Sequence, residues 1–275
     1  MNERLPQATP HKSDASDRRA TLTISIVSHR HMRDCAQLID DLVRINPPDL
    51  ARVILTLNVP EDVPVLRELP FELSVIRNRE PMGFAANHNA AFELVTTEYF
   101  AVLNPDLRIA RDPFPALLSR AADERVAVTS PVILESSGNK ADFERKLVSP
   151  WDIVRRRFAT VERRNKPRPP QWLAGVFFVF RSDIYRRLGG FHAGYRLYCE
   201  DADLCARARL QGLLLEVAHE VSVVHRARRA SHRSPVHLRL HLSSLVKFWT
   251  SAVYRQYREL LRAESRGYVR ASNSR

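Results

Sequence analysis

Apolar runs rich in β-branched residues alternate with amphipathic segments along the first half of the chain. Four of these runs predict buried strands, at 22–30, 51–59, 71–78 and 99–109. Residues 32–45 place apolar side chains at helical spacing before an Asn-Pro-Pro stop, and 83–97 predict a loop that turns into a helix. This alternation predicts an α/β fold with a mostly parallel sheet, in which ligands bind beyond the carboxyl ends of the strands.

The second half of the chain is less regular. Residues 113–134 predict a helix followed by a strand, and 213–226 predict two short strands. Between them, 137–170 form a polar, basic and proline-rich excursion. An apolar strand that begins at Trp172 leads into a helix closed by two glycines at 189–190.

The C-terminal tail predicts a helix with an apolar stripe between Arg and Lys residues. The stripe consists of Leu238, Leu242, Leu245, Val246 and Trp249. We therefore divide the chain into a flexible N-terminal arm (1–20), a globular domain (21–232) and a basic amphipathic helical extension (233–275). Two roles of the extension stay open: it rests on the inner face of an acidic membrane, or it packs on the domain.

Composition narrows the class of partner. Lys and Arg outnumber Asp and Glu by 43 to 31, a formal net charge of +12 that suits nucleic acid, an acidic membrane or a phosphorylated small molecule. No nucleic-acid-recognition motif accompanies this charge, so we expect no nucleic-acid partner. The three cysteines lack metal-ligand spacing and are typical of reduced thiols. With neither a secretory signal nor an apolar run of ~20 residues, we expect a cytoplasmic protein.

Polar residues follow several predicted strands and allow two interpretations each. Asn104 and Asp106 in "LNPD" can offer two oxygen ligands to Mg²⁺ or Mn²⁺, or simply form a turn. In "GFAANHN", Gly83 can approach a ligand closely and Asn89 lies in the first turn of a helix, where a phosphate or a plain helix cap would fit. His225 after "VSVV" either completes a metal site or makes a structural hydrogen bond.

Three carboxylates occur within four residues in "YCEDADL". Acidic residues at a helix start stabilise the helix dipole, which accounts for one or two of Glu200, Asp201 and Asp203. A carboxylate in a cleft can also act as the general base of an enzyme. The stretch alone favours neither interpretation.

Taken in order, seven segments resemble a family 2 glycosyltransferase of the GT-A fold. They are "ISIVSHR", "VILTLNVPED", "GFAANHN", "VLNPDL", "WLAGVFFVFR", "LGGF…YCEDADLCARARLQG" and "VVHRARRASHR". The resemblance covers roughly residues 22 to 232, and is strongest to bacterial rhamnosyltransferase-like enzymes, which build cell-surface polysaccharide. It implies a Rossmann-like, mostly parallel mixed sheet flanked by helices, with the catalytic domain at 21–232.

The resemblance also implies a reaction and its catalytic residues. A sugar (rhamnose or a related hexose) passes with inversion from a nucleotide-diphospho-sugar, dTDP- or UDP-linked, to a lipid-linked or nascent saccharide. Asp201 falls on the position of the general base, and Glu200 beside it on a contact to acceptor or sugar hydroxyls. Asp106, Asn104 and His225 fall on the positions that bind the divalent metal, Mg²⁺ or Mn²⁺.

Other positions are assigned to the substrates by the same resemblance. The donor-binding residues are Ser28, His29, Asn58, Gly83, Phe84 and Asn89, with Asn104 and Asp106 at the diphosphate. Trp172 and Gly175 lie on the acceptor side. Two departures affect specificity: Leu57 replaces an acidic residue that contacts the nucleotide base in relatives, and "GGFHA" replaces "GGFDE". A homologue that binds the nucleotide-sugar without turnover is the alternative.

Overall fold

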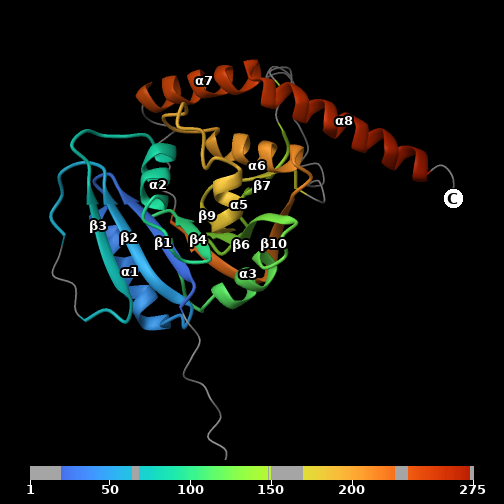
Figure 1. Ribbon diagram of the computed structural model, residues 1–275. Coiled ribbons are helices and arrows are strands. Elements are labelled where there is room, and N and C mark those ends of the chain that lie inside the picture. The colour runs from blue at the N-terminus through green and yellow to red at the C-terminus, as the bar shows by residue number, and fades with distance from the viewer. Residues whose placement is uncertain (1–19, 64–67, 148, 150–169, 227–234, 273–275) are drawn as a thin grey trace, which may run out of the picture.

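A mixed eight-stranded sheet forms the centre of the protein (Figure 1). The computed structural model describes residues 20–63, 68–147, 149, 170–226 and 235–272. The strand order is β3-β2-β1-β4-β9-β6-β10-β5. The strands are β1 (Leu22–Ser28), β2 (Leu50–Leu57), β3 (Glu72–Arg77), β4 (Tyr99–Leu103), β5 (Leu107–Arg108), β6 (Val126–Glu135), β9 (Phe177–Arg181) and β10 (Leu214–His225). A separate pair joins β7 (Glu144–Arg145) to β8 (Trp172–Leu173).

The sheet is mostly parallel, as the sequence predicts. The neighbouring pairs among β3, β2, β1 and β4 are parallel, and so is the pair of β6 with β10. β9 runs antiparallel to β4 and β6, and β5 runs antiparallel to β10. Both antiparallel strands lie in the half of the sheet that also contains β6 and β10, which makes the sheet mixed.

Helices pack on the sheet and across one of its ends. They are α1 (Met32–Ile45), α2 (Phe84–Phe92), α3 (Phe114–Ala121), α5 (Ser182–Arg187), α6 (Glu200–Leu210), α7 (Pro235–Thr250) and α8 (Ala252–Ser272). α1 has the bounds that its apolar spacing predicts, and it buries Cys35, Leu38, Ile39 and Leu42 against the sheet. The strands contribute fully buried side chains such as Ile24, Ile26 and Leu55 to the same core.

Two predictions of strand continuity are wrong. Residues 214–225 form one long strand rather than two, with a shift of register between Ala218 and Ser222 that absorbs the polar residues in its middle. The apolar run from Trp172 is not one strand, because residues 174–176 interrupt it between β8 and β9. The interrupting residues 174–176 contact both Asn104 and Asp201.

The C-terminal extension packs on the domain through part of its surface. Phe248 of α7 and Tyr254 of α8 join a buried cluster with Tyr195, Cys199 and Ala202. The tail is two helices rather than one, because the chain breaks at Ser251, whose hydroxyl accepts a hydrogen bond from the Tyr254 N–H at 3.0 Å. Among the described residues, no helix is both long and apolar enough to span a bilayer.

Parts of four predicted segments lie outside the described residues. They are the N-terminal arm, of which only residue 20 is described, residues 148 and 150–169 of the basic excursion, the end of the domain at 227–232, and residues 233–234 and 273–275 of the C-terminal extension.

Candidate active site

A turn after β4 brings Asp106 against His225. The strand ends at Leu103, and Asn104 begins the turn that leads into β5. β5 pairs with the last residues of β10, with Leu107 opposite His225. As a result, Asp106 Oδ1 lies 3.1 Å from His225 Nε2. The sheet therefore joins two of the three predicted metal ligands, and the third starts the same turn.

The Asp106 carboxyl is held in its ionised form. Burial acts to raise its pKa, but the hydrogen bond and charge of His225, with a smaller effect from His31, outweigh burial and lower the pKa below its ordinary value. The side chains of Asp106 and His225 are 20% and 18% exposed, so both remain accessible from solvent. An ionised carboxylate beside an accessible imidazole can bind a divalent cation.

An ion-pair network behind this turn was not predicted from the sequence. The Arg108 guanidinium donates two hydrogen bonds to the Asp41 carboxylate of α1, at 2.7 and 2.8 Å, and a third to Gln37 Oε1 at 2.7 Å. The Ile109 N–H donates to the same carboxylate at 3.0 Å. Asp41 is buried, and these donors lower its pKa despite the opposing effect of burial. The network fixes β5 against α1, two residues beyond Asp106.

The predicted ligands suit a divalent metal in a phosphate site. Within the part of the chain that the structure describes, no three His, Cys, Asp or Glu side chains gather into a metal-binding cluster. Mg²⁺ in phosphate chemistry takes only one or two carboxylates from the protein, because water and substrate phosphates complete its coordination. A carboxylate and an imidazole in contact, with the Asn104 amide on the same turn, meet that requirement.

A strained turn precedes the acidic pair at the start of α6. Tyr198 and Cys199 have φ angles of 73° and 68°, in the left-handed region that residues with side chains rarely adopt. Each such residue costs on the order of 1–3 kcal/mol and persists where surrounding packing fixes it, often at functional sites. Cys199 is buried in the cluster beneath α7, and the helix begins directly after it at Glu200. The acidic pair therefore lies in the first turn.

Asp201 is half-buried, and two backbone N–H groups fix its carboxylate. Oδ2 accepts a hydrogen bond from Gly175 at 2.9 Å, and Oδ1 accepts one from Ala202 at 2.8 Å. A Cβ at position 175 would lie 3.1 Å from Asp201 Cβ, so a side chain there would press on the acid. Burial raises the pKa of Asp201 despite these hydrogen bonds. A carboxylate with a raised pKa is a stronger base than one in water.

Glu200 is more buried than its neighbour, with an exposed fraction of 6%. Its Oε2 has no hydrogen-bond partner within the described residues. Burial, with a further contribution from the nearby charge of Asp201, raises the pKa of Glu200 to about 8. Glu200 is therefore protonated at neutral pH.

The interruption between β8 and β9 connects the two acidic sites. The Asn104 N–H donates to the Val176 carbonyl at 2.9 Å, and the Val176 N–H donates to the Ala174 carbonyl at 2.7 Å. The residue between them, Gly175, holds Asp201. One tight turn therefore contacts the start of the Asn104–Asp106 segment on one side and the Asp201 carboxylate on the other.

Asn58 forms a closed amide network at the end of β2. Its Nδ2 donates to the Met82 carbonyl at 2.9 Å and lies 3.0 Å from His29 Nδ1, while its Oδ1 accepts from the Met82 N–H at 2.7 Å and from Asn78 Nδ2 at 2.8 Å. The Asn58 side chain thus connects the loop before α2 to the loop that follows β1. Leu57, which replaces the expected acidic residue, is buried in β2.

Ser28 is tied to a carboxylate that sequence reasoning missed. Its hydroxyl donates to Glu61 Oε1 at 2.8 Å, and Glu61 also accepts from the N–H groups of Arg30 and Met32, at 2.7 and 3.1 Å. Glu61 therefore fixes the loop between β1 and α1, leaving His29 and Arg30 exposed at the carboxyl edge of the sheet.

Gly83 and Asn89 join α2 to the segment before α6. The Phe84 N–H donates to the Arg196 carbonyl at 3.1 Å, and a Cβ on Gly83 would lie only 2.6 Å from that oxygen. Asn89 donates to the Phe191 carbonyl at 2.7 Å and accepts from the Phe191 N–H at 3.0 Å. The predicted close approach at Gly83 is therefore to the protein's own backbone, and the Asn89 amide is engaged in packing.

On the predicted acceptor side, Trp172 lies in β8. Its Nε1 donates to the Lys146 carbonyl at 2.9 Å, and the Arg145 guanidinium lies 5.0 Å from its ring centroid. The charge of Arg145 also acts on Asp201, opposing the rise of its pKa. Arg145 is thus a cation near Asp201 that the sequence did not single out.

The sheet order and the position of this site define a nucleotide-diphospho-sugar transferase (GT-A) fold. A mannosyltransferase from Pyrobaculum calidifontis, PcManGT, solved with GDP-Man and Mn²⁺, superposes with a TM-score of 0.55 over 93% of this chain and 80% of that one, at 16% identity. Residues 35–189, more than half of the chain, match the family described as Glycosyl transferase family 2. The chain belongs to that family.

Two curated proteins are similar in sequence to this chain. The chain is 27% identical over 166 residues to rhamnosyltransferase WbbL of Escherichia coli K12, covering 54% of this chain and 62% of that protein. It is also 27% identical over 191 residues to the N-acetylglucosaminyl-diphospho-decaprenol L-rhamnosyltransferase of Mycobacterium tuberculosis, covering 62% of this chain and 61% of that protein. The chain thus spans less than two thirds of the length of either relative.

Proposed function

We propose that this protein is an inverting glycosyltransferase with Asp201 as its general base. It transfers a hexose or deoxyhexose from a dTDP- or UDP-linked donor to a lipid-linked or nascent cell-surface saccharide. Rhamnose is the first candidate for the transferred sugar. The observation that carries this proposal is the turn at 174–176, which contacts both Asp201 and the start of the Asn104–Asp106 segment. The names of both curated relatives, which specify rhamnosyl transfer, support rhamnose as the first sugar to test.

The geometry supports a single displacement at the anomeric carbon. Asp201 takes the proton of the acceptor hydroxyl as the acceptor oxygen bonds to that carbon from one face. The bond to the nucleotide diphosphate breaks on the opposite face, and its electron pair leaves with the diphosphate, so the configuration inverts. The Gly175 and Ala202 N–H groups keep the Asp201 carboxylate oriented while it accepts the proton.

A divalent cation, Mg²⁺ or Mn²⁺, would be held by Asp106, Asn104 and His225, and would neutralise charge that develops on the departing diphosphate. The solvent-accessible pair of Asp106 and His225, with its 3.1 Å contact, supports this assignment. An imidazole nitrogen of His225 would be one ligand of that cation, beside the Asp106 carboxylate. Arg30 and Arg196 are exposed near this edge and offer positive charge to the diphosphate.

The main role of Glu200 is its effect on the ionisation of Asp201. Its raised pKa of about 8 keeps it neutral at pH 7, so that it does not oppose ionisation of Asp201. The contact of Glu200 with a sugar or acceptor hydroxyl remains a prediction, and its 6% exposure restricts that contact to a narrow edge of the side chain.

A thermal-shift screen of nucleotide-sugars with Mn²⁺ tests the proposal. A donor that binds only the folded protein stabilises it by about 2.7 kcal/mol at a hundredfold excess over its Kd. We expect one dTDP- or UDP-sugar to raise the Tm more with Mn²⁺ than without it, and Asp106→Ala to remove the Mn²⁺-dependent part. The matched control is Asp62→Ala, which changes an exposed carboxylate.

Two results would contradict the proposal. If no nucleotide-sugar raises the Tm of the wild type, the donor assignment is wrong. If a donor binds but no transfer to saccharide or lipid-linked saccharide is detected, the chain is instead a nucleotide-sugar-binding homologue without turnover.

A further inference from the structure

α7 presents an apolar stripe to solvent. Leu238, Leu242 and Val246 are 56%, 53% and 56% exposed. They are spaced four residues apart, so they follow one side of the helix over about 12 Å. The predicted stripe of the tail therefore divides in two: Leu245 and Trp249 pack towards the protein, and these three residues face outward.

Contacts on the opposite side of α7 fix this orientation. The Ser244 hydroxyl donates to the Leu197 carbonyl at 2.7 Å, and Lys247 Nζ donates to the Gly194 carbonyl at 2.7 Å. Phe248 is buried in the cluster with Tyr195. The helix is thus seated on the domain, and it cannot turn to bury the stripe without losing these contacts.

The stripe lies at the end of the molecule that carries the site. α7 rests on residues 194–197, the same segment whose Arg196 carbonyl meets the start of α2. In Figure 1, α7 crosses the molecule above α2 and α6. Since residues 194–197 lead directly to Glu200 and Asp201, a surface that holds the stripe would also face the acceptor side.

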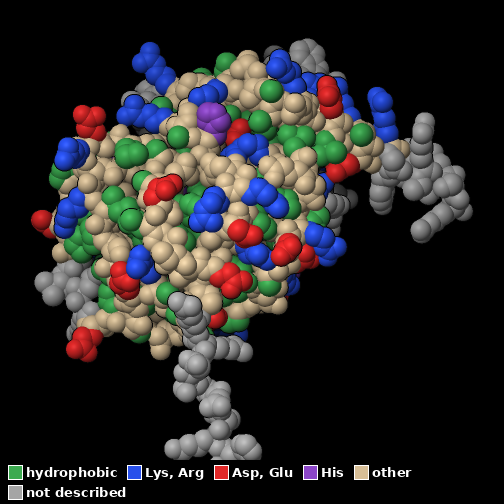
Figure 2. Space-filling view, viewed as in Figure 1, with side chains coloured by type: hydrophobic (Ala, Val, Ile, Leu, Met, Phe, Trp, Pro, Cys, Tyr) green, Lys and Arg blue, Asp and Glu red, His purple; other side chains and the backbone are tan. Residues whose placement is uncertain are grey.

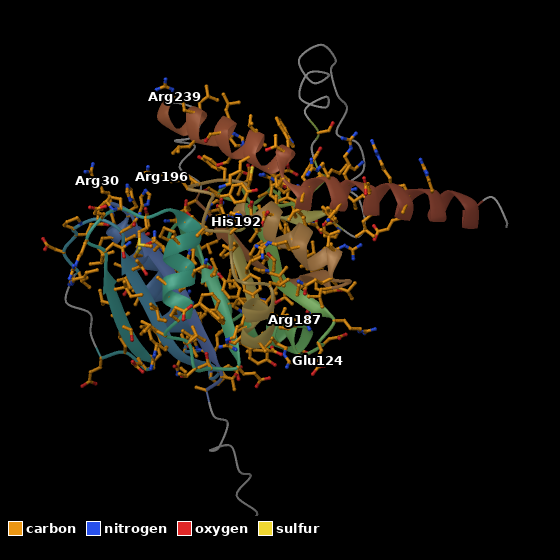
Figure 3. The ribbon with its side chains drawn as sticks, turned by 45° about the horizontal axis from the view of Figure 1, so that its top comes forward. Arg30, Glu124, Arg187, His192, Arg196 and Arg239 are labelled. Carbon is orange, nitrogen blue, oxygen red and sulfur yellow. The ribbon has the colours of Figure 1, made fainter. Side chains whose placement is uncertain are left out.

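The charge around the stripe is positive. The sequence of α7 contains no acidic residue, and its exposed Arg239 directly follows Leu238 of the stripe. Figure 3 shows Arg30, Arg196 and Arg239 extending from this same end. Along the upper edge of Figure 2, where α7 lies in the matching view, basic and apolar side chains lie among one another.

Positive charge continues along the next helix. α8 carries exposed arginines spaced three or four residues apart, which places them along one side. They are Arg255, Arg258, Arg262 and Arg266. The exposed Glu259 lies on the same side and Glu264 pairs with Arg209, so arginines outnumber acids on this side of the helix. Apolar residues flanked by cations match the boundary between the headgroups and acyl chains of an anionic bilayer.

We propose that the stripe of Leu238, Leu242 and Val246 docks this protein on an anionic phospholipid surface. The inference rests on the proposed function, because docking in this orientation would place the acceptor side of the site next to lipid-linked saccharides. The acyl chains receive the three apolar side chains, and Arg239 with the α8 arginines contacts the lipid phosphates.

Vesicle co-sedimentation tests the proposal. The stripe variant is Leu238→Gln/Leu242→Gln/Val246→Gln, since Gln keeps a high helix propensity. The matched control is Val75→Gln/Leu94→Gln, which removes two other exposed apolar side chains, 39% and 44% exposed, away from α7. Vesicles contain either phosphatidylglycerol with phosphatidylcholine or phosphatidylcholine alone. Circular dichroism and thermal unfolding establish that both variants fold like the wild type.

We expect the wild type and the control to bind the phosphatidylglycerol vesicles, and the stripe variant to bind at least about tenfold more weakly. Binding to phosphatidylcholine alone should be weaker for all three, and 0.5 M salt should weaken binding to the anionic vesicles. Equal binding by the wild type and the stripe variant overturns the proposal. It is also overturned if sedimentation equilibrium shows a wild-type dimer and a monomeric stripe variant, because a second copy then covers the stripe.

A transfer assay on a water-soluble saccharide acceptor separates this proposal from the proposed function. Without vesicles, the stripe variant should transfer as fast as the wild type. If neither protein transfers, the proposed function fails while the vesicle result still decides the docking. If both proteins transfer and both bind vesicles equally well, the docking proposal alone fails.

Discussion

Replacing Glu200 by Gln should stabilise the protein above neutral pH. The glutamine amide has nearly the shape of the protonated carboxyl but cannot ionise. Burial and the charge of Asp201 raise the pKa of Glu200 from 4.5 to about 8. A tenfold change in an acid dissociation constant is worth about 1.4 kcal/mol, so ionising Glu200 in the folded protein costs up to about 5 kcal/mol more than in the unfolded chain.

The sign of the effect follows from proton linkage. Below pH 4.5 the carboxyl is protonated in both states and carries no penalty. Between pH 4.5 and about 8 the unfolded chain ionises while the folded protein keeps its proton, so the free energy of unfolding of the wild type falls as pH rises. Above pH 8 the penalty is constant. The Gln variant lacks this dependence, so its advantage grows through the same window.

Urea unfolding of both proteins at pH 5, 6, 7, 8 and 9 measures this difference. We expect the variant to gain several kcal/mol on the wild type between pH 5 and 8.5, and Glu93→Gln, an exposed control, to gain nothing. A difference between wild type and Glu200→Gln that stays constant across the pH range would refute the reasoning.

Two further substitutions test contacts around the site. Arg108→Ala leaves the buried Asp41 carboxylate without its main partner and should lower the free energy of unfolding by about 2–3 kcal/mol. The control Arg125→Ala, on the surface, should have no measurable effect. Equal effects of the two substitutions would argue against a stabilising role for the network. Asn89→Ala removes the partner of the Phe191 carbonyl, one of two acceptors of the Phe191 N–H and the acceptor of the buried Tyr185 hydroxyl, and should cost about 2–4 kcal/mol in denaturant unfolding. The control is Asn139→Ala, in an exposed turn. If Asn89→Ala unfolds at the same denaturant concentration as the wild type, the Asn89 amide binds the nucleotide-sugar donor rather than stabilising the packing.

Local patterns in the sequence predict the regular elements well. The spacing of Cys35, Leu38, Ile39 and Leu42 predicts the α1 helix with its observed bounds, because one buried face determines both its position and its length. The apolar strand runs likewise predict the parallel part of the sheet. The division at Ser251 was missed because no glycine or proline marks it in the sequence, whereas the break depends on how two helices pack on the domain.

Contacts between distant segments limit what the sequence reveals about the site. The pairing of Asp106 with His225 depends on the register of β5 against β10, which neither segment encodes alone. The same holds for Arg108 with Asp41, and for Glu61, whose three hydrogen bonds cross between two loops.

The turn at 174–176 shows the same limit in a different way. Its residues continue an apolar run, and hydropathy alone predicts an unbroken strand. At the observed break the Gly175 N–H donates to the Asp201 carboxylate of α6, a contact with a distant segment that the run itself does not encode. A glycine inside an apolar strand pattern was the local signal that could have indicated it.

The most direct test of the account is the turnover of Asp201→Asn. The variant keeps the shape of the side chain but removes the base, and general base catalysis typically contributes about 10²- to 10⁴-fold. With the donor found by thermal shift and a saccharide acceptor, we expect transfer to fall by at least about a hundredfold while the donor-induced Tm shift stays unchanged. Asp62→Asn should transfer like the wild type. An Asp201→Asn protein that retains most of its turnover would contradict the assignment of the base, and with it the central claim.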